Sequence, residues 1–228
     1  MKKTLIITPT IFEAEPILSE LGATEKSYVG DCIERDSIVC LISGIGCERS
    51  AERVKTAIEK YTPEVVILAG FCGACNKSFA NGDLIYETSS QTLSIIASKL
   101  RGTRGKIACV EKIADTTKKM ELGSKGFDGV EMEFDFFKEA IANSNAEFIH
   151  LRWISDSLES DIPPDFFEST MDRKSGGLNL SVWGLVKSLV KSPLLIIKLA
   201  KFGKEIAPAK KRYATSAKAL IKILMESC

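Results

Sequence analysis

The sequence predicts an α/β protein built around a central β-sheet. Short apolar runs typical of buried strands alternate with segments whose apolar residues recur at helical spacing. The chain has 228 residues, 45% of them hydrophobic and 27% charged, which suffices for one globular domain with a full core. This composition excludes a disordered tail protein, a collagen and a small disulfide scaffold.

Strands and helices are predicted to alternate as far as residue 155. The predicted strands are short apolar runs, at residues 5–8, 37–42, 65–69, 84–86, 106–110, 129–132 and 148–155. The predicted helices are amphipathic and cover residues 13–21, 50–61, 112–122 and 134–142. Gly22 and Pro63 end the first two helices. The uninterrupted apolar run 65–69 is typical of a strand buried on both faces.

From residue 178 onward the pattern becomes helical and amphipathic. Apolar residues between Val182 and Val190 follow helical spacing. A last helix is predicted over residues 209–225, after breaks at Gly203 and Pro208.

Charge is distributed unevenly along the chain. Residues 181–228 carry ten Lys or Arg and two Glu, a net charge of +8, whereas residues 1–180 carry −7. We therefore divide the chain at residue 180, and we expect 181–228 either to pack on the domain or to contact an anionic membrane surface. The whole chain has a net charge of +1, which gives no reason to expect nucleic acid as a partner.

The cysteines and the N-terminus indicate a cytoplasmic protein. Seven cysteines are an odd number without the spacing of a disulfide framework. Cys72-Gly-Ala-Cys75 is a single pair that nothing completes to a zinc site, so we expect no metal. The apolar stretch after Met1 breaks at Pro9, which favours a first strand over a secretion signal. No apolar stretch approaches the roughly 20 residues needed to cross a bilayer.

Carboxylates are the candidate chemical groups. His150, the single histidine, lies in an apolar predicted strand and is expected to be a satisfied core residue. Glu131 and Glu133 end one predicted strand, Asp156 ends another, and Glu15 follows the first. Ligands of α/β proteins bind at the carboxyl ends of strands, so these acids are placed to converge on one ligand. The alternative is that they cap helices.

Short segments in a fixed order resemble a known superfamily. They are residues 8–15 (TPTIFEAE), 43–46 (SGIG), 63–74 (PEVVILAGFCGA) with 81–84 (NGDL), 129–133 (GVEME) and 152–156 (RWISD). Together they resemble the nucleoside phosphorylase/nucleosidase superfamily, which includes methylthioadenosine/S-adenosylhomocysteine nucleosidase. The resemblance implies a three-layer αβα fold with a central mixed sheet over residues 1–180, plus C-terminal amphipathic helices. It also implies cleavage of an N-glycosidic bond without a cofactor, and a homodimer.

The resemblance also implies roles for individual residues. Glu133 would hold the ribose 2′- and 3′-hydroxyls, with Met132 packed against the sugar. Asp156 would protonate the purine at N7, with Ser155 beside it, and Glu15 would orient the attacking water. The other expected substrate-binding residues are Glu131, Ile113, Gly70, Phe71, Cys72 and Gly73.

The nucleophile is argued from the same motifs. Phosphorolysis needs cations around a dianion, but Leu68 stands where purine phosphorylases of this family carry an arginine. Glu15 would repel phosphate, so we favour hydrolysis over phosphorolysis. Phe71 and Phe134 depart from the family pattern, and the segment 87–104 is short. A member that binds a nucleoside or lipid without turnover is therefore the alternative from another class.

A branch of the superfamily is suggested by residues 111–113, Lys118, Lys119, the stretch 126–133 and residues 192–194. These look like the hopanoid-associated members, which are implied to remove adenine from adenosylhopane. The resemblance therefore implies a 5′-substituted adenine nucleoside as substrate, either lipid-linked or of the methylthioadenosine type.

Overall fold

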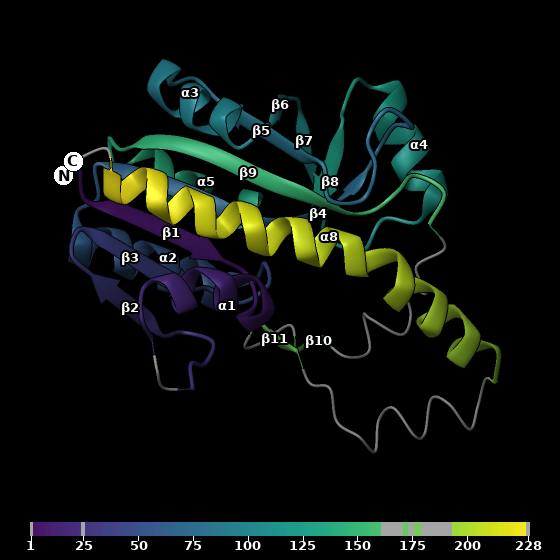
Figure 1. Ribbon diagram of the computed structural model, residues 1–228, viewed down its shortest axis with the longest axis horizontal. Helices are drawn as coiled ribbons and strands as arrows, with labels where there is room; N and C mark the ends of the chain where they lie inside the picture. The colour runs from purple at the N-terminus through teal and green to yellow at the C-terminus, as the bar shows by residue number, and fades with distance from the viewer. Residues whose placement is uncertain (1, 24–25, 161–170, 173–175, 179–192, 227–228) are drawn as a thin grey trace.

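The computed structural model describes residues 2–23, 26–160, 171–172, 176–178 and 193–226 (Figure 1). In this part of the chain the centre is a mixed sheet of nine strands. They are β1 (Thr4–Thr8), β2 (Cys32–Arg35), β3 (Ile38–Ile42), β4 (Val65–Ala74), β5 (Leu84–Thr88), β6 (Thr103–Arg104), β7 (Ile107–Cys109), β8 (Gly129–Glu131) and β9 (Glu147–Asp156). A separate two-stranded ladder joins β10 (Met171–Asp172) to β11 (Gly177–Leu178).

The long strands β4 and β9 form the middle of the sheet, whose order is β2-β3-β1-β4-β9-β5-β6. They pair in parallel, and nearly all of their residues are buried because the sheet is covered on both faces. The register shifts between Cys72 and Gly73, so that Gly73 lies opposite Asp156. Beyond this irregularity the end of β4 pairs with β8, which in turn pairs with β7. Two long strands and two short ones therefore end in the same region.

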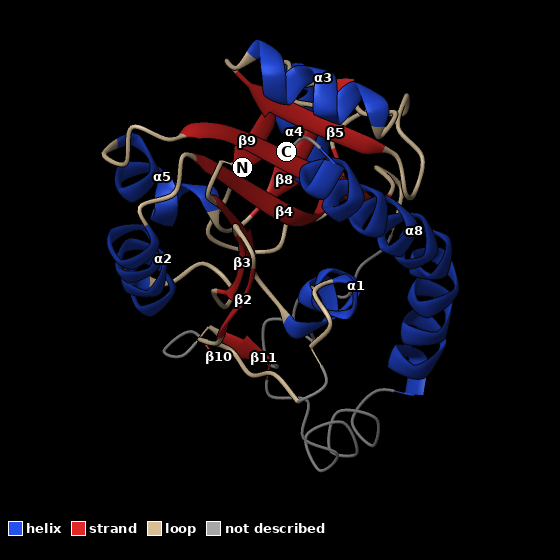
Figure 2. Cartoon of the chain, turned by 60° about the vertical axis from the view of Figure 1, so that its left-hand side comes forward, coloured by secondary structure: helices blue, strands red, loops and turns tan. Residues whose placement is uncertain are grey.

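Helices cover both faces of the sheet, as the α/β fold class predicts (Figure 2). The helices are α1 (Ile11–Glu20), α2 (Glu48–Tyr61), α3 (Gln91–Lys99), α4 (Thr116–Ser124), α5 (Phe134–Ala142) and α8 (Pro193–Glu226). One core cluster joins α1, α3 and α8 to one face of the sheet, and another joins α2 and α5 to the opposite face. The result is the expected three-layer arrangement with a C-terminal helix.

The C-terminal helix α8 runs through Gly203 and Pro208, so the predicted breaks at these residues are wrong. A proline inside a helix costs about 3 kcal/mol. The helix buries Tyr213, Leu220 and further apolar side chains after the proline, each worth about 1.5–3 kcal/mol, which offsets that cost. The predicted helical stripe at 182–190 lies outside the described residues. Within the described residues, no helix combines the length and apolarity needed to cross a membrane.

Several elements differ from the expectations. Residues 91–99, within the segment expected only to be short, form α3, which Ser90 caps by accepting a 3.2 Å hydrogen bond from the Leu93 N–H. The edge strand β2 was not predicted because its side chains are half-buried or exposed and carry little apolar signal. The predicted helix 112–122 begins later, at Thr116, where Asp115 is the N-cap. The helix predicted over 134–142 is confirmed at both ends.

Candidate functional site

The Arg152 guanidinium is the centre of a buried cluster of charged side chains. Arg152 lies on β9 and is fully buried. Its Nη2 atom forms ion pairs with Glu131 at 2.5 Å and with Glu133 at 3.0 Å. Its Nε donates to His150 Nε2 at 2.8 Å, and its Nη1 donates to the Phe71 carbonyl at 3.4 Å. Every nitrogen of the guanidinium therefore has an acceptor from the protein itself.

The buried acids around Arg152 outnumber its charge, and their pKa values divide accordingly. Burial acts to raise the pKa of Glu131, but the guanidinium and His150 outweigh it and hold that pKa to about 2. Burial raises the pKa of Glu133 well above its usual range, and the neighbouring Glu131 charge adds to the effect. Burial also raises the pKa of Glu13. The guanidinium thus holds the pKa of one carboxyl group low, whereas burial raises the pKa of the other two.

Glu13 enters the cluster from the first turn of α1. Thr10 is the N-cap of this helix, and Thr10 and Glu13 form a capping box. Glu13 Oε2 accepts hydrogen bonds from the Thr10 N–H at 3.0 Å and from the Thr10 hydroxyl at 2.6 Å. Its Oε1 accepts from the Phe71 N–H at 2.8 Å. Cap and strand together hold a buried carboxylate in one orientation.

Gly70 on β4 lies directly against the charged cluster, at a position where a side chain would not fit. A Cβ atom at this position would lie 2.5 Å from Arg152 Nη1 and 2.6 Å from Glu13 Oε1. These distances are shorter than any tolerated contact, so a side chain here would displace both charged groups. The apolar run of β4 therefore needs a glycine where it passes between α1 and β9.

Asp156 lies at the end of β9, beside a buried lysine. Its Oδ1 atom contacts the Ser155 hydroxyl, which also lies 3.1 Å from the Cys72 carbonyl oxygen. Its Oδ2 atom forms an ion pair with Lys119 of α4. A Cβ on Gly73 would lie 2.9 Å from Lys119 Cε and 3.0 Å from Asp156 Oδ2. The glycine at the β4 irregularity thus allows this pair to form.

The structure brings together most of the expected site residues. Glu131, Glu133, Ser155 and Asp156 are all buried, and residues 70–73 of β4 lie between them. Met132 is half-buried, and its carbonyl lies so close to Gly46 that a Cβ there would be 2.0 Å away.

Glu15 and Ile113 are not brought to the cluster. Glu15 is exposed on α1, because residues two apart on a helix lie on nearly opposite faces. Glu13 occupies the interior position that was expected for Glu15. Ile113 is half-buried and lines a separate pocket of about 690 Å³ with Phe136.

Three charged residues of the cluster were missed from the sequence. The spacing Thr10-x-x-Glu13 is a signal for a capping box, but such a signal is usually read as a helix start and not as a functional acid. Arg152 and Asp156 both fall on even positions of one strand, and period-two spacing places them on one face. Lys119 was noted only for the branch resemblance, and nothing in the sequence marks it as the partner of Asp156, which is 37 residues away.

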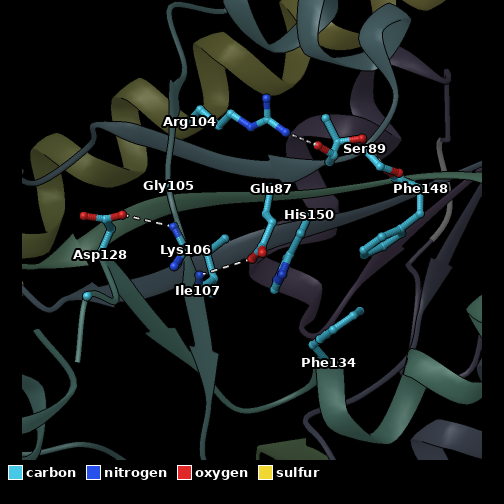
Figure 3. Close-up of a pocket in the computed structure, with 12 residues that line it drawn as sticks. Glu87, Ser89, Arg104, Gly105, Lys106, Ile107, Asp128, Phe134, Phe148 and His150 are labelled. Atoms are coloured by element: carbon cyan, nitrogen blue, oxygen red, sulfur yellow. Dashed lines mark hydrogen bonds between the residues drawn. The ribbon is translucent and has the colours of Figure 1, made fainter.

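A second pocket of about 800 Å³ lies behind the cluster, beside His150 (Figure 3). The Phe134 ring stacks on Phe148 at 5.4 Å between centroids and also contacts His150 at 5.3 Å. Burial and the Arg152 charge lower the pKa of His150 to about 3, so the ring that accepts from Arg152 is neutral. The Phe134 ring therefore packs against Phe148 and His150.

Phe71 also departs from the family pattern without closing the site. Its ring packs against Tyr213 of α8 at 4.9 Å between centroids. Its backbone supplies the contacts to the cluster, with the N–H bound to Glu13 and the carbonyl facing Arg152. The side chain at this position thus joins the core, whereas the main chain faces the charged groups.

Comparison with known proteins places the fold in a class. Residues 6–92 match the model of the Phosphorylase superfamily. No curated protein gives a significant match. The match over residues 6–92 confirms the superfamily resemblance of the motifs within that range, and the fold of the chain is similar to that of solved nucleosidase structures.

Within this class, the similar structures are nucleosidases and a related hydrolase. The 5′-methylthioadenosine/S-adenosyl homocysteine nucleosidase of Helicobacter pylori has a TM-score of 0.66 and 18% identity, and the match covers 97% of this chain and 98% of that one. The Campylobacter jejuni nucleosidase has a TM-score of 0.61 and 21% identity, covering 84% of this chain and 100% of that one. Futalosine hydrolase of Helicobacter pylori has a TM-score of 0.65 and 16% identity, covering 97% of both chains.

Proposed function

We propose that this protein is a nucleosidase that hydrolyses the N-glycosidic bond of a purine nucleoside. The observation that carries the proposal is the pair of buried carboxylates, Glu13 and Glu133, on either side of Arg152. One carboxylate can act on water while the other holds the sugar. Asp156, at the end of the same strand as Arg152, would act on the leaving base.

Glu13 is proposed as the base that orients and deprotonates the attacking water. Burial raises its pKa, and a general base works best when its pKa approaches the working pH. Its hydrogen bonds from Thr10 and Phe71 fix the carboxylate while leaving lone pairs for a further donor. This assignment replaces the exposed Glu15.

Glu133 is proposed to bind the ribose hydroxyls, with Glu131 and Arg152 holding it in place. A carboxylate accepts hydrogen bonds from two vicinal hydroxyls. Negative charge beside the sugar also stabilises the oxocarbenium-like transition state that forms as the base departs. Arg152 keeps Glu131 ionised, so the sugar side of the site carries that charge.

Water is favoured over phosphate as the nucleophile because the cations are already engaged. Among the described residues, the cations that contact the buried acids are Arg152 and Lys119, and both are paired with carboxylates. A phosphate dianion placed beside Glu13, Glu131 and Glu133 would meet several acids and no released cation. Phosphorolysis is the second candidate, and a non-catalytic nucleoside-binding role is the third.

The finer substrate proposal is a 5′-substituted adenine nucleoside. Its support is that several similar structures are methylthioadenosine/S-adenosyl homocysteine nucleosidases, one of them solved with 5′-methylthioadenosine in its active site. An adenosylhopane-like substrate is proposed only on the motif resemblance of residues 111–133 and 192–194. A homodimer is likewise proposed from the superfamily resemblance.

Product analysis tests the proposal directly. The full chain is incubated with methylthioadenosine, S-adenosylhomocysteine, inosine and a lipid-tailed adenosine, each with and without phosphate. The expected products are free purine and a reducing sugar, at a rate that phosphate does not change. A sugar 1-phosphate formed only with phosphate would instead establish a phosphorylase. Binding without any turnover would favour the non-catalytic role.

A further inference from the structure

Lys119 is a buried cation to which the proposed reaction has given no role. It lies on α4 and is 1% exposed. Its ammonium forms an ion pair with Asp156 and donates a 3.1 Å hydrogen bond to the Ser157 carbonyl. Both side chains of the ion pair are at most 5% exposed. The pair therefore lies inside the protein, at the end of β9, where Asp156 is the last residue.

Stability alone does not account for this pair. Removing two charges from water costs several kcal/mol per ion, and replacing a buried pair by apolar residues is often neutral or stabilising. α4 already contributes an apolar anchor, Leu122, to its own core cluster. A methionine or leucine at position 119 would meet the same packing need. The charge of Lys119 acts on one carboxylate, which is the one proposed to protonate the base.

We propose that Lys119 is a positioning residue that acts through Asp156, so that the two side chains form one proton-donating unit for the departing purine. This inference rests on the proposed nucleosidase function. A lone buried Asp must already carry a proton when substrate binds. The pair instead stores the transferable proton on the ammonium and delivers it through the carboxyl group.

The step balances in protons and electrons. One proton passes from Lys119 Nζ to Asp156 and on to purine N7, and the ammonium becomes an amine. The C1′–N9 bond breaks, and its electron pair goes to the purine. The water oxygen bonds to C1′, and Glu13 takes the proton that this water loses. Solvent then returns a proton to Lys119 and removes the one from Glu13.

Other titratable groups that face the pair belong to β4 and to the residue that follows it. Burial raises the pKa of the Cys72 thiol well above its usual range and raises that of Cys75 to about 11. Arg152 is also on β9, but its guanidinium is engaged by Glu131 and Glu133. Neither thiol therefore changes charge near neutral pH beside the Lys119–Asp156 ion pair.

The test compares leaving groups that do and do not need a proton. Lys119→Met is assayed with whichever purine nucleoside the wild type cleaves and with p-nitrophenyl β-D-ribofuranoside, whose phenolate leaves unprotonated. We expect kcat for the purine nucleoside to fall on the order of 100-fold or more with little change in KM, since general acid catalysis contributes about 10²–10⁴-fold. Hydrolysis of the nitrophenyl riboside should stay within about threefold of wild type. Lys119→Arg keeps the positive charge beside Asp156, but a guanidinium does not give up its proton, so this variant should not restore the purine activity.

Matched controls separate this role from a structural one. Lys125→Met removes an exposed lysine at the C-cap of the same helix and should leave kcat unchanged for both substrates. Equal losses on both substrates, or no loss on either, would overturn the inference. If Lys119→Met does not fold, the wild-type pH profile decides. Its purine kcat/KM should not fall as the pH rises from about 6 to 8, whereas a tenfold fall for each unit of rising pH would contradict the relay. A wild type that cleaves no purine nucleoside would overturn the proposed function itself.

Discussion

The Tyr213 hydroxyl donates a 2.6 Å hydrogen bond to the backbone carbonyl of Glu13, joining residues 200 apart in the sequence. This bond ties the C-terminal helix α8 to the helix that carries the proposed base. The Tyr213 ring also packs against Phe71 and Trp153 at 4.9 and 4.8 Å between centroids. The C-terminal helix is thus part of the support of the site.

Tyr213→Phe tests this support. The ring contacts persist, and only the hydroxyl is lost, so we expect a loss of about 1 kcal/mol in the free energy of unfolding. Tyr213→Ala also removes the ring and should cost about 3–5 kcal/mol. Urea denaturation measures both. Equal stability of Tyr213→Ala and wild type would contradict the packing of α8 on the core.

Glu13→Gln and Glu15→Gln distinguish the two acids of α1. Glu13→Gln removes the buried group proposed to deprotonate water, so kcat should fall on the order of 100-fold or more. Glu15→Gln changes an exposed side chain on the opposite face of the same helix and should leave kcat within about twofold. Steady-state kinetics of the purified variants gives the answer. The reverse pattern would restore Glu15 as the base.

Glu133→Gln is expected to separate stability from activity. Because burial raises the pKa of Glu133 in the folded state, folding binds a proton and stability falls as pH rises above the unfolded value of 4.5. Removing this acid should therefore stabilise the protein at pH 7, by about 1.4 kcal/mol for each unit of raised pKa. Below about pH 4 the gain should disappear, since the acid is then protonated in both states.

Denaturation curves of Glu133→Gln at neutral and acidic pH measure this difference, and sugar binding supplies the second readout. Turnover should fall, because the amide cannot supply the carboxylate that accepts both ribose hydroxyls. A variant that is less stable than wild type at pH 7 and no less active would refute both assignments.

Gly70→Ala is predicted to disable the site through space alone. The added methyl would lie 2.5 Å from Arg152 Nη1 and 2.6 Å from Glu13 Oε1. Displacement of catalytic groups by about 1 Å can cost roughly 100-fold in rate. Gly203→Ala is the matched control, since a Cβ there meets nothing within 4 Å and alanine favours a helix by about 1 kcal/mol. Activity assays and thermal unfolding measure both variants. Gly70→Ala should lose activity, whereas Gly203→Ala should keep its activity and be at least as stable as the wild type.

The local pattern predicted much of the fold because it depends on near neighbours. The helix Phe134–Ala142 and the strands that became β1, β3, β4 and β9 follow from apolar spacing and from adjacent glycine and proline. The acids at the ends of β8 and β9 were predicted to converge because parallel strands end at one edge of a sheet. In the structure β8 runs antiparallel to β4 and β9, and the acids meet because the short strand β8 pairs with the end of β4. β2 was missed because its apolar signal is weak. α3 was missed although Leu93, Ile96 and Ala97 follow helical spacing.

The sequence by itself determined the α/β class and most of the strands, and it predicted Glu133 and Asp156 as candidate acids of the site. Only the tertiary structure decided that Glu13 and not Glu15 points inward, because packing of α8 and β4 against α1 selects one face of that helix. It also decided that Arg152 and Lys119 have carboxylate partners. A buried charge needs an oppositely charged or hydrogen-bonding partner close to it in space. The separation of two residues in the sequence does not predict which of them become such partners.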